Sequence, residues 1–327
     1  MDYARIKGFN YQPSYGSNGF ELWQTFDPTI IDQELGRGKT YFPGMTAVRV
    51  WLSWDAFIHG PEQFAANFDT MLAIAATYDL VVMPVLFNRW HNHFLDYGGI
   101  YIDHFLPGVS WVQKEKMFAP YVDMVVGRHA RDTRVFAWDL CNEPFSYSCP
   151  PADIPAIFAA EYRWLENLYQ TCKELGAEAP LTIGIHPMHR REGLERIEPI
   201  SDILSIHPYW TPSRHGPPDQ PQPDADKTTY EQLLDDYVAV ATRVNKPLLA
   251  TETCWGSLDD AERVDIIRYT LGELKKRDIG WLAYLLHHSL IADAHRPEFG
   301  PVAEPGNLAF IECDGALRPG HDIFNDF

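Results

Sequence analysis

Eight short apolar segments that alternate with amphipathic stretches constrain the fold of this chain more than any other feature. They are residues 6–11, 47–52, 80–87, 135–141, 181–185, 203–207, 247–251 and 280–286. Continuous runs of this length, rich in β-branched and aromatic residues, are typical of strands buried on both faces. Eight such strands alternating with helices in 327 residues predict an α/β fold, a (β/α)8 TIM barrel that forms a single domain over 1–327.

The connections between these segments favour the barrel over its main rival, a doubly wound open sheet. No Gly-rich phosphate-binding fingerprint follows the first apolar segment, as that open sheet would favour. The long insertions all follow predicted strands, and they are residues 88–115, 142–152, 208–228 and 287–305. This asymmetry is expected when the carboxyl-terminal face of a barrel is elaborated for function.

Two helix starts can be read directly from the sequence. Asp27 followed by Pro28 is typical of an N-cap and a first helical residue. Ser257, with Asp260 three residues later, resembles a capping box. We therefore expect one helix to begin at Pro28 and another directly after Ser257.

Net charge and cysteine usage exclude several classes of partner. The chain has 27 Lys and Arg against 45 Asp and Glu, a formal net charge of −18. A surface of that sign repels phosphate backbones and anionic lipids, so we expect no nucleic-acid or membrane partner. Five cysteines without a C-x-x-C pair are typical of reduced thiols, and the first residues contain no apolar signal-peptide core. Both features predict a cytoplasmic protein, and the oligomeric state stays open.

Two glutamates lie at the carboxyl ends of predicted strands. Asn142-Glu143-Pro144 directly follows the fourth strand, and the seventh strand ends on Glu252. In a closed barrel these strands lie on roughly opposite sides, so both side chains can point over one pocket. A lone glutamate there could equally open a loop or hold a salt bridge. A facing pair is what cleavage of a glycosidic bond needs, because one carboxyl group protonates the departing oxygen while the other attacks the anomeric carbon.

Four motifs in this order resemble glycoside hydrolases of clan A, and most closely the cellulase-type family 5. They are Arg49, Asn142-Glu143-Pro144, His207-Pro208-Tyr209 and Glu252, and the resemblance covers nearly the whole chain. It implies a retaining mechanism in which Glu143 is the general acid and then the base, Glu252 is the nucleophile, and the carboxyl groups lie about 5–5.5 Å apart. It also implies that Arg49 and Tyr209 keep Glu252 ionised, that Asn142 binds the hydroxyl next to the reacting carbon, and that His207 lines the same subsite.

Further substrate-binding candidates follow from the same resemblance. Tyr284 stands where the family normally has a tryptophan platform, and Asn88 and His91 lie where it has polar sugar ligands, in an unusual local sequence. Tryptophans on the predicted loops could either stack on sugar rings or pack the loops. These are Trp90, Trp111, Trp210 and Trp255. Trp51 and Trp138 lie within predicted strands, so we expect them in the core.

Taken together, the residues predict an enzyme that hydrolyses a β-glycosidic bond in a soluble oligosaccharide or small β-glycoside, without a metal or organic cofactor. Three alternatives stay open. A transglycosidase would use the same first half-reaction, and a non-catalytic sugar-binding barrel would keep only the aromatic residues. A zinc- or manganese-dependent barrel hydrolase or isomerase would use histidines of the predicted upper loops. Those histidines are His91, His93, His104, His287 and His288.

Overall fold

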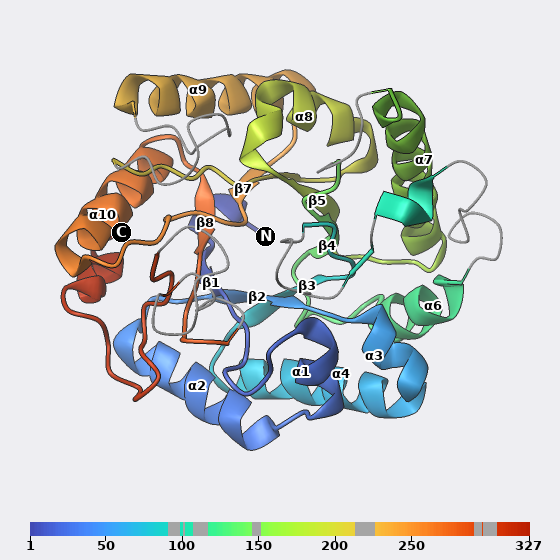
Figure 1. The fold of residues 1–327 in the computed structure, drawn as a ribbon, viewed down its shortest axis with the longest axis horizontal. Helices are drawn as coiled ribbons and strands as arrows, with labels where there is room; N and C mark the ends of the chain where they lie inside the picture. The colour runs from blue at the N-terminus through green and yellow to red at the C-terminus, as the bar shows by residue number, and fades with distance from the viewer. Residues whose placement is uncertain are drawn as a thin grey trace.

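The protein forms a closed barrel of eight parallel strands, β1 to β8, paired in chain order (Figure 1). The structure is a computed structural model that describes residues 1–90, 99–100, 102–106, 117–145, 152–212, 226–290, 296 and 306–327. The strands are β1 Lys7–Asn10, β2 Ala47–Trp51, β3 Val81–Val85, β4 Trp138–Asn142, β5 Leu181–Ile185, β6 Leu204–Ile206, β7 Leu248–Ala250 and β8 Gly280–Ala283. Because β8 also pairs with β1 in parallel, the sheet closes, and the predicted (β/α)8 barrel is confirmed.

Helices surround the barrel on its outside (Figure 1). Within the described residues they are α1 Gly19–Gln24, α2 Pro28–Tyr41, α3 Trp54–His59, α4 Pro61–Thr77, α6 Ala119–Arg128, α7 Ile154–Glu174, α8 Arg190–Ile197, α9 Lys227–Val244 and α10 Asp260–Lys276. Short 3-10 turns add Tyr3–Arg5, Ile102–Phe105, Pro187–His189, Glu198–Ile200 and His321–Asp326. No helix in this described part of the chain is both long and apolar enough to cross a bilayer.

One predicted helix start is confirmed and the other is wrong by two residues. Asp27 caps α2 by accepting hydrogen bonds from the backbone of Thr29 and Ile30, with Pro28 as the first helical residue. The cap of α10 is Asp259, which accepts from the backbone N–H of Glu262, and not Ser257. Ser257 instead donates its hydroxyl proton to the Glu262 carboxylate. Glu262 is therefore held by both residues: Asp259 accepts from its backbone N–H, and Ser257 donates to its carboxylate.

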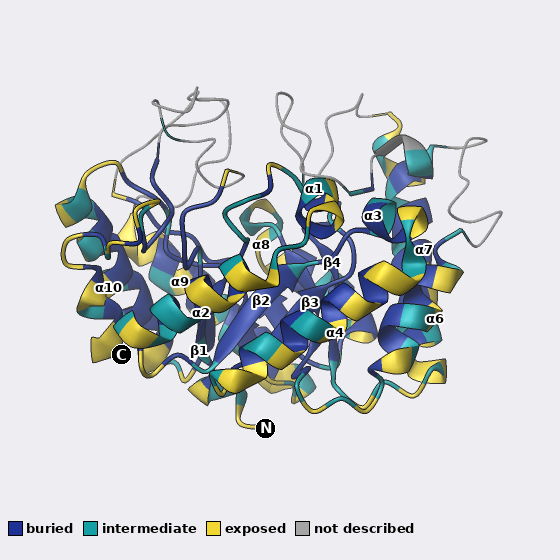
Figure 2. Ribbon diagram, turned by 90° about the horizontal axis from the view of Figure 1, so that it is seen from below, coloured by how far each residue is buried: buried dark blue, intermediate teal, exposed yellow. Residues whose placement is uncertain are grey.

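The barrel interior changes from apolar to polar along its axis. Its amino-terminal part holds a compact apolar group, made of Ile6, Ala47, Met83, Phe136, Ala137, Ile203, Leu249 and Leu282. The larger apolar core lies between the sheet and the helices and includes the fully buried Trp138, which is a core residue as expected. Figure 2 shows most strand residues buried, with many exposed residues on the outer faces of the helices. Beyond this apolar group, Asn10 and Asn142 end their strands, and Glu143 and Glu252 lie just past the strand ends.

The described cysteines are all free thiols. Cys141, Cys172 and Cys254 are buried, and Cys313 is exposed. Burial raises the pKa of Cys172 and of Cys254 to about 12, so neither is poised as a thiolate.

Candidate active site

Glu252 lies just beyond the end of β7, where two strong donors grip its carboxylate. Arg49 Nη1 donates to Glu252 Oε1 at 2.6 Å, and the Tyr209 hydroxyl donates to Oε2 at 2.8 Å. Burial raises the pKa of Glu252, and the Arg49 charge and the two hydrogen bonds oppose that rise. Burial and the nearby Glu252 charge also raise the pKa of Tyr209 well above its usual value, so the phenol remains a donor. The Arg49 cation and the Tyr209 hydroxyl therefore stabilise a negative charge on Glu252.

Several hydrogen bonds hold the Arg49 guanidinium in place beneath Glu252. Its side chain is fully buried, and Nε and Nη2 both donate to Asp139 Oδ2, at 3.1 and 2.8 Å. Nη1 also donates to Asn10 Oδ1 at 2.9 Å, and Nη2 to Asn142 Oδ1 at 2.7 Å. A buried guanidinium needs such partners, because an unpaired charge in the interior costs several kcal/mol. Asp139 and Asn10 thus hold the cation in place for Glu252.

Neither Asp139 nor Asn10 was among the predicted site residues, although the sequence contained a signal for both. Each is a polar residue within an otherwise apolar predicted strand, 135–141 and 6–11. Buried polar groups in a strand require hydrogen-bond partners inside the fold. The partners could not be named without knowing which strands face each other.

An irregularity in β4 aims Asn142 and Glu143 at the same pocket. Asp139 is in register with Thr182 of β5 and Asn142 with Gly184, so β4 holds one extra residue between the two pairs. Such a bulge changes the alternation of side chains, and both Asp139 and Asn142 contact Arg49. Glu143 then adopts a left-handed backbone with φ of 48°. A non-glycine residue in that region costs about 1–3 kcal/mol, and such residues cluster at active sites as well as in turns.

Glu143 contacts a histidine where Glu252 contacts an arginine and a tyrosine. Its Oε1 is hydrogen-bonded to His207 Nδ1 at 2.6 Å, and the same nitrogen lies 3.7 Å from Glu252 Oε2. One oxygen of Glu143, one oxygen of Glu252 and a ring nitrogen of His207 all lie within 4.8 Å of one another. Burial raises the pKa of Glu143, and the Glu252 charge adds to the rise while His207 opposes it. The two carboxyl groups therefore meet in one buried pocket, as the barrel geometry predicted.

His207 connects Glu143 to the neighbouring strands. Its Nε2 is hydrogen-bonded to Thr251 Oγ1 at 3.1 Å, and this hydroxyl is in turn hydrogen-bonded to Ser205. Burial lowers the pKa of His207, which favours the neutral ring, while the contact with Glu143 opposes that shift. Room for the ring depends on Gly184, where a Cβ atom would lie 2.7 Å from His207 Nε2.

The remaining predicted binding residues surround this pocket to different degrees. Asn88 Oδ1 accepts from Asn142 Nδ2 at 2.9 Å, while its own amide donates to the Trp90 carbonyl. Trp255 is half-buried and lies edge-on to Tyr209, with ring centroids 5.2 Å apart. Tyr284 is also half-buried. His91, like His93 and Trp111, lies outside the described residues.

The prediction for Trp51 was wrong, and one of the loop tryptophans has a packing role. Trp51 is half-buried rather than in the core, with the Arg49 guanidinium 4.6 Å from its ring centroid and Tyr284 edge-on at 6.1 Å. Side chains two residues apart lie on the same face of a strand, so Trp51 points to the inner face of the barrel, as Arg49 does. Trp210, in contrast, is buried against Tyr269 of α10, with ring centroids 4.5 Å apart.

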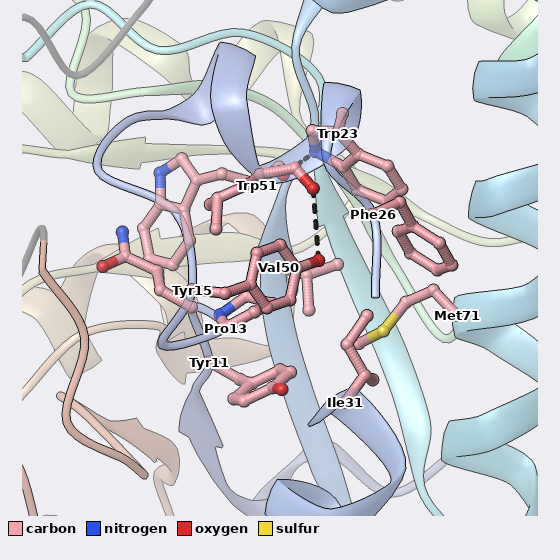
Figure 3. Close-up of a pocket in the computed structure, with 11 residues that line it drawn as sticks. Tyr11, Pro13, Tyr15, Trp23, Phe26, Ile31, Val50, Trp51 and Met71 are labelled. Atoms are coloured by element: carbon pink, nitrogen blue, oxygen red, sulfur yellow. Dashed lines mark hydrogen bonds between the residues drawn. The ribbon is translucent and has the colours of Figure 1, made fainter. Parts of the chain in front are cut away.

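A small apolar cavity lies beside Trp51, between β1, β2 and the helices α1, α2 and α4 (Figure 3). It holds about 20 Å³, enough for roughly one water molecule. Trp23 Nε1 donates to the Trp51 carbonyl at 2.8 Å across this region. The cavity is too small for a sugar ring, and we interpret it as part of the packing that supports Trp51.

The donor set of the pocket suits proton transfer better than metal binding. Glu143, His207 and Glu252 are close enough to share an ion. However, the Arg49 cation already contacts Glu252, and a second cation beside it would be repelled. Among the described histidines, His104, His287 and His288 join no cluster of potential ligands. His287 Nε2 is instead hydrogen-bonded to Arg37 at 2.7 Å.

The chain is similar to known mannan-degrading proteins in sequence and in structure. It is 28% identical over 195 residues to the probable mannan endo-1,4-beta-mannosidase A of Aspergillus niger, covering 52% of this chain and 48% of that protein. It is 29% identical over 174 residues to the mannan endo-1,4-beta-mannosidase A of Hypocrea jecorina, covering 51% and 36%. The chain thus spans less than half the length of these curated relatives.

Solved structures share the fold at low sequence identity. An exo-beta-1,4-mannosidase from Opitutaceae bacterium strain TAV5 superimposes with a TM-score of 0.69 at 18% identity, over 98% of this chain and 58% of that one. The endo-beta-1,4-mannanase from Thermotoga petrophila gives 0.68 at 15% identity, over 100% and 76%. Residues 39–289 match the family model of Cellulase (glycosyl hydrolase family 5). The chain has an eight-stranded barrel in which Glu143, Glu252 and Arg49 lie close together. It belongs to glycosyl hydrolase family 5.

Proposed function

We propose that this protein hydrolyses β-glycosidic bonds with retention of configuration, using Glu252 as the nucleophile and Glu143 as the general acid and base. The observation that carries the proposal is the close approach of the two buried glutamates, because an oxygen of one carboxyl group lies within 4.8 Å of an oxygen of the other. Retaining enzymes place their carboxyl groups about 5–5.5 Å apart, whereas an intervening water requires about 6.5–9.5 Å. The short separation favours direct attack by one carboxylate.

The unequal surroundings of the two glutamates support this division of roles. Glu252 contacts a full cation and a phenol donor, so the negative charge of the pair is stabilised best there. Glu143 is hydrogen-bonded to an imidazole whose pKa burial lowers, and the Glu252 charge raises the pKa of Glu143, so the surroundings favour keeping the proton of the pair on Glu143. This division supplies a carboxylate for attack and a carboxylic acid for protonation at the same time.

The reaction follows in two displacements. A Glu252 oxygen attacks the anomeric carbon while the Glu143 proton passes to the glycosidic oxygen, so the leaving group departs as an alcohol and a glycosyl ester forms on Glu252. Glu143, now ionised, takes a proton from a water molecule that attacks the anomeric carbon. The ester bond breaks, Glu252 is released as a carboxylate, and both glutamates return to their starting states.

For the substrate, we propose soluble β-1,4-linked manno-oligosaccharides. Support comes from the relatives, because the curated proteins that match are named as mannan endo-1,4-beta-mannosidases. The half-buried Trp51, Tyr284 and Trp255 beside the glutamates offer apolar ring faces of the kind on which sugars stack.

Trapping of the glycosyl-enzyme intermediate tests the proposal. A 2-deoxy-2-fluoro-β-mannoside with a dinitrophenyl leaving group should inactivate the protein and add one fluoromannosyl group to the peptide containing Glu252, as measured by mass spectrometry. Glu252→Gln should not be labelled, whereas Glu174→Gln, which alters an exposed carboxylate near the end of α7, should be labelled as the unmodified protein is. The initial product observed by NMR should be the β-anomer. A first-formed α-anomer, or turnover by Glu252→Gln, would contradict the mechanism.

A further inference from the structure

We infer that His186 binds the leaving-group side of the substrate by donating a hydrogen bond from Nε2 to a sugar hydroxyl. The inference rests on the proposed function and deepens it, because it names a residue for the subsite beyond the bond that is cleaved. Neither the sequence motifs nor the site described above includes His186. It lies directly after β5, between the two strands that are followed by Glu143 and Glu252.

The alternation of β5 directs His186 into the mouth of the barrel. Gly184 faces inward, because a Cβ atom there would lie 2.7 Å from His207 Nε2 and 3.2 Å from Asp139 Oδ2. Ile185 faces outward and is buried beside Gly193 of α8. His186 has an extended backbone, with φ of −61° and ψ of 141°, so its side chain returns to the face of Gly184, one step nearer the mouth.

A backbone contact fixes which nitrogen of His186 can donate. Nδ1 accepts a hydrogen bond from the Met188 N–H at 3.2 Å, where His186 caps the turn Pro187–His189. A neutral imidazole that accepts at Nδ1 carries its proton on Nε2. Burial lowers the pKa of His186 to about 4, and the Glu252 charge only partly opposes this. The ring is therefore a neutral donor at any pH where Glu252 is ionised and Glu143 protonated.

This donor is available to a ligand. His186 is half-buried, so its ring is in part open to solvent. Within the described residues, the hydrogen bond from Met188 engages Nδ1, and none engages Nε2. A neutral N–H donor without a fixed protein acceptor suits an uncharged hydroxyl group, whose oxygen accepts the bond and whose proton remains free for water or another residue.

The order of the strands places His186 on the leaving-group side. The line between Glu143, after β4, and Glu252, after β7, divides the barrel mouth into two arcs. The longer arc, β8 to β3, presents the ring faces of Trp51 and Tyr284 and the amide of Asn88, which suit the sugar that remains bound. The proton of Glu143 goes to the departing oxygen, so the leaving group extends over the shorter arc, β5 and β6. There His207 and Tyr209 are already bonded to the glutamates, whereas Nε2 of His186 has no acceptor within the described residues.

Two matched variants separate this role from capping of the turn. In His186→Asn, the amide oxygen replaces Nδ1 as acceptor for Met188, but no group reaches the position of Nε2. In His186→Gln, the amide N–H₂ replaces Nε2 as donor, while the acceptor for Met188 is lost. A binding role predicts that Asn is the damaging substitution, whereas a purely structural role predicts that Gln is.

The measurement compares two leaving groups on the same glycon. On β-1,4-mannotriose, whose leaving group carries hydroxyls, His186→Asn should lower kcat/KM about tenfold, the usual effect of one hydrogen bond. On 4-nitrophenyl β-mannoside or β-mannobioside, whose leaving group has no hydroxyl, kcat/KM should stay unchanged. His186→Gln should remain close to the unmodified protein on both.

Each other outcome has a definite meaning. An equal loss on both substrates, or a loss in Gln and not in Asn, overturns the inference. No loss on either substrate also overturns it. If the unmodified protein hydrolyses neither substrate and is not labelled by the fluoromannoside, the proposed function has failed before the question of His186 arises. A melting temperature that matches that of the unmodified protein confirms that both variants are folded.

Discussion

The ends of β4 and β7 each place a glutamate in the same pocket, but the two glutamates have different hydrogen-bond donors. At β7, Glu252 receives hydrogen bonds from Arg49 and Tyr209, one of which comes from a full cation. At β4, Glu143 is hydrogen-bonded to His207, whose pKa is lowered by burial. Both carboxyl groups are buried, so burial alone cannot distinguish them. In the proposed mechanism, the neighbouring donors therefore distinguish the roles of two chemically identical side chains.

The largest effect should come from removing the carboxylate at β7. Glu252→Gln keeps the side-chain size and still accepts from Arg49, but it cannot form the glycosyl ester, so kcat should fall by about 10⁴-fold or more. Steady-state assays with a dinitrophenyl β-mannoside measure this fall. In Glu252→Ala, added azide should restore turnover and yield the α-mannosyl azide. A Glu252→Gln variant that retained a tenth of the activity would remove the difference between the two sites.

The carboxyl group at β4 should show an effect that depends on the leaving group. Glu143→Gln cannot donate a proton, so kcat/KM on mannotriose should fall by about 10²–10⁴-fold. A dinitrophenolate departs without protonation, so formation of the intermediate from that substrate should be nearly unaffected. Rapid-quench measurement of the first turnover distinguishes the two. Equal losses on both substrates would show that Glu143 is not the acid.

The hydrogen bonds that hold Glu252 can be weakened while a positive charge is kept beside it. Arg49→Lys keeps a cation, but a single ammonium group cannot donate to Asp139, Asn10, Asn142 and Glu252 at once. We expect kcat/KM to fall by about 10²-fold. Because the Arg49 contact opposes the rise in the pKa of Glu252, the variant should also protonate Glu252 at higher pH. Tyr41→Phe, which removes a distant hydroxyl bonded to the Gly315 carbonyl, is the control.

The pH profile of kcat/KM shows in which direction Arg49 shifts the pKa of Glu252. In the unmodified protein, kcat/KM should fall on the acid side as Glu252 gains a proton and on the alkaline side as Glu143 loses one. Burial raises the pKa of both groups above that of a free glutamate. Arg49→Lys should move the acid limb to higher pH and thereby narrow the bell. An acid limb that stays in place would indicate that Arg49 does not tune Glu252.

The smallest effect should come from a methyl group placed beside the β4 site. In Gly184→Ala, the new Cβ would lie 2.7 Å from His207 Nε2, so the imidazole must shift relative to Glu143. We expect a loss of about tenfold in kcat/KM, with the alkaline limb moved because the His207 contact affects the pKa of Glu143. Gly272→Ala in α10 is the matched control, since its Cβ would meet only Phe327 at an ordinary 3.7 Å. Equal behaviour of the two variants would show that His207 is not constrained.

The fold was predictable because the barrel is encoded locally and repeatedly. Every strand of the structure lies in or overlaps its predicted apolar segment, and β5 matches residues 181–185 exactly as expected for a strand bounded by Pro180 and His186. Most other segments ran one to three residues too long, as in 280–286 against Gly280–Ala283. Apolar side chains also continue into the buried loops beyond a strand, so hydrophobicity alone does not mark where pairing stops.

Part of the site was predictable for the same reason. Glu252 and Glu143 follow apolar strands in a barrel, and strand ends of one polarity meet at one face. The error at Trp51 came from treating a strand tryptophan as core, although Arg49 two residues earlier already indicated an inward face. Asp139 was missed because its partner, Arg49, lies 90 residues away, and only barrel closure brings the two side chains together.

The sequence by itself determined the barrel, its polarity and the presence of two acidic residues at one end. Periodicity and strand order act over a few residues at a time, so they can be read without coordinates. The tertiary structure alone decided how the acids are aimed. The extra residue between Asp139 and Asn142 and the positive φ of Glu143 leave no mark in the hydrophobic pattern. They arise because β4 must pair with β5 while also packing around a buried cation, and that requirement exists only once the barrel has closed.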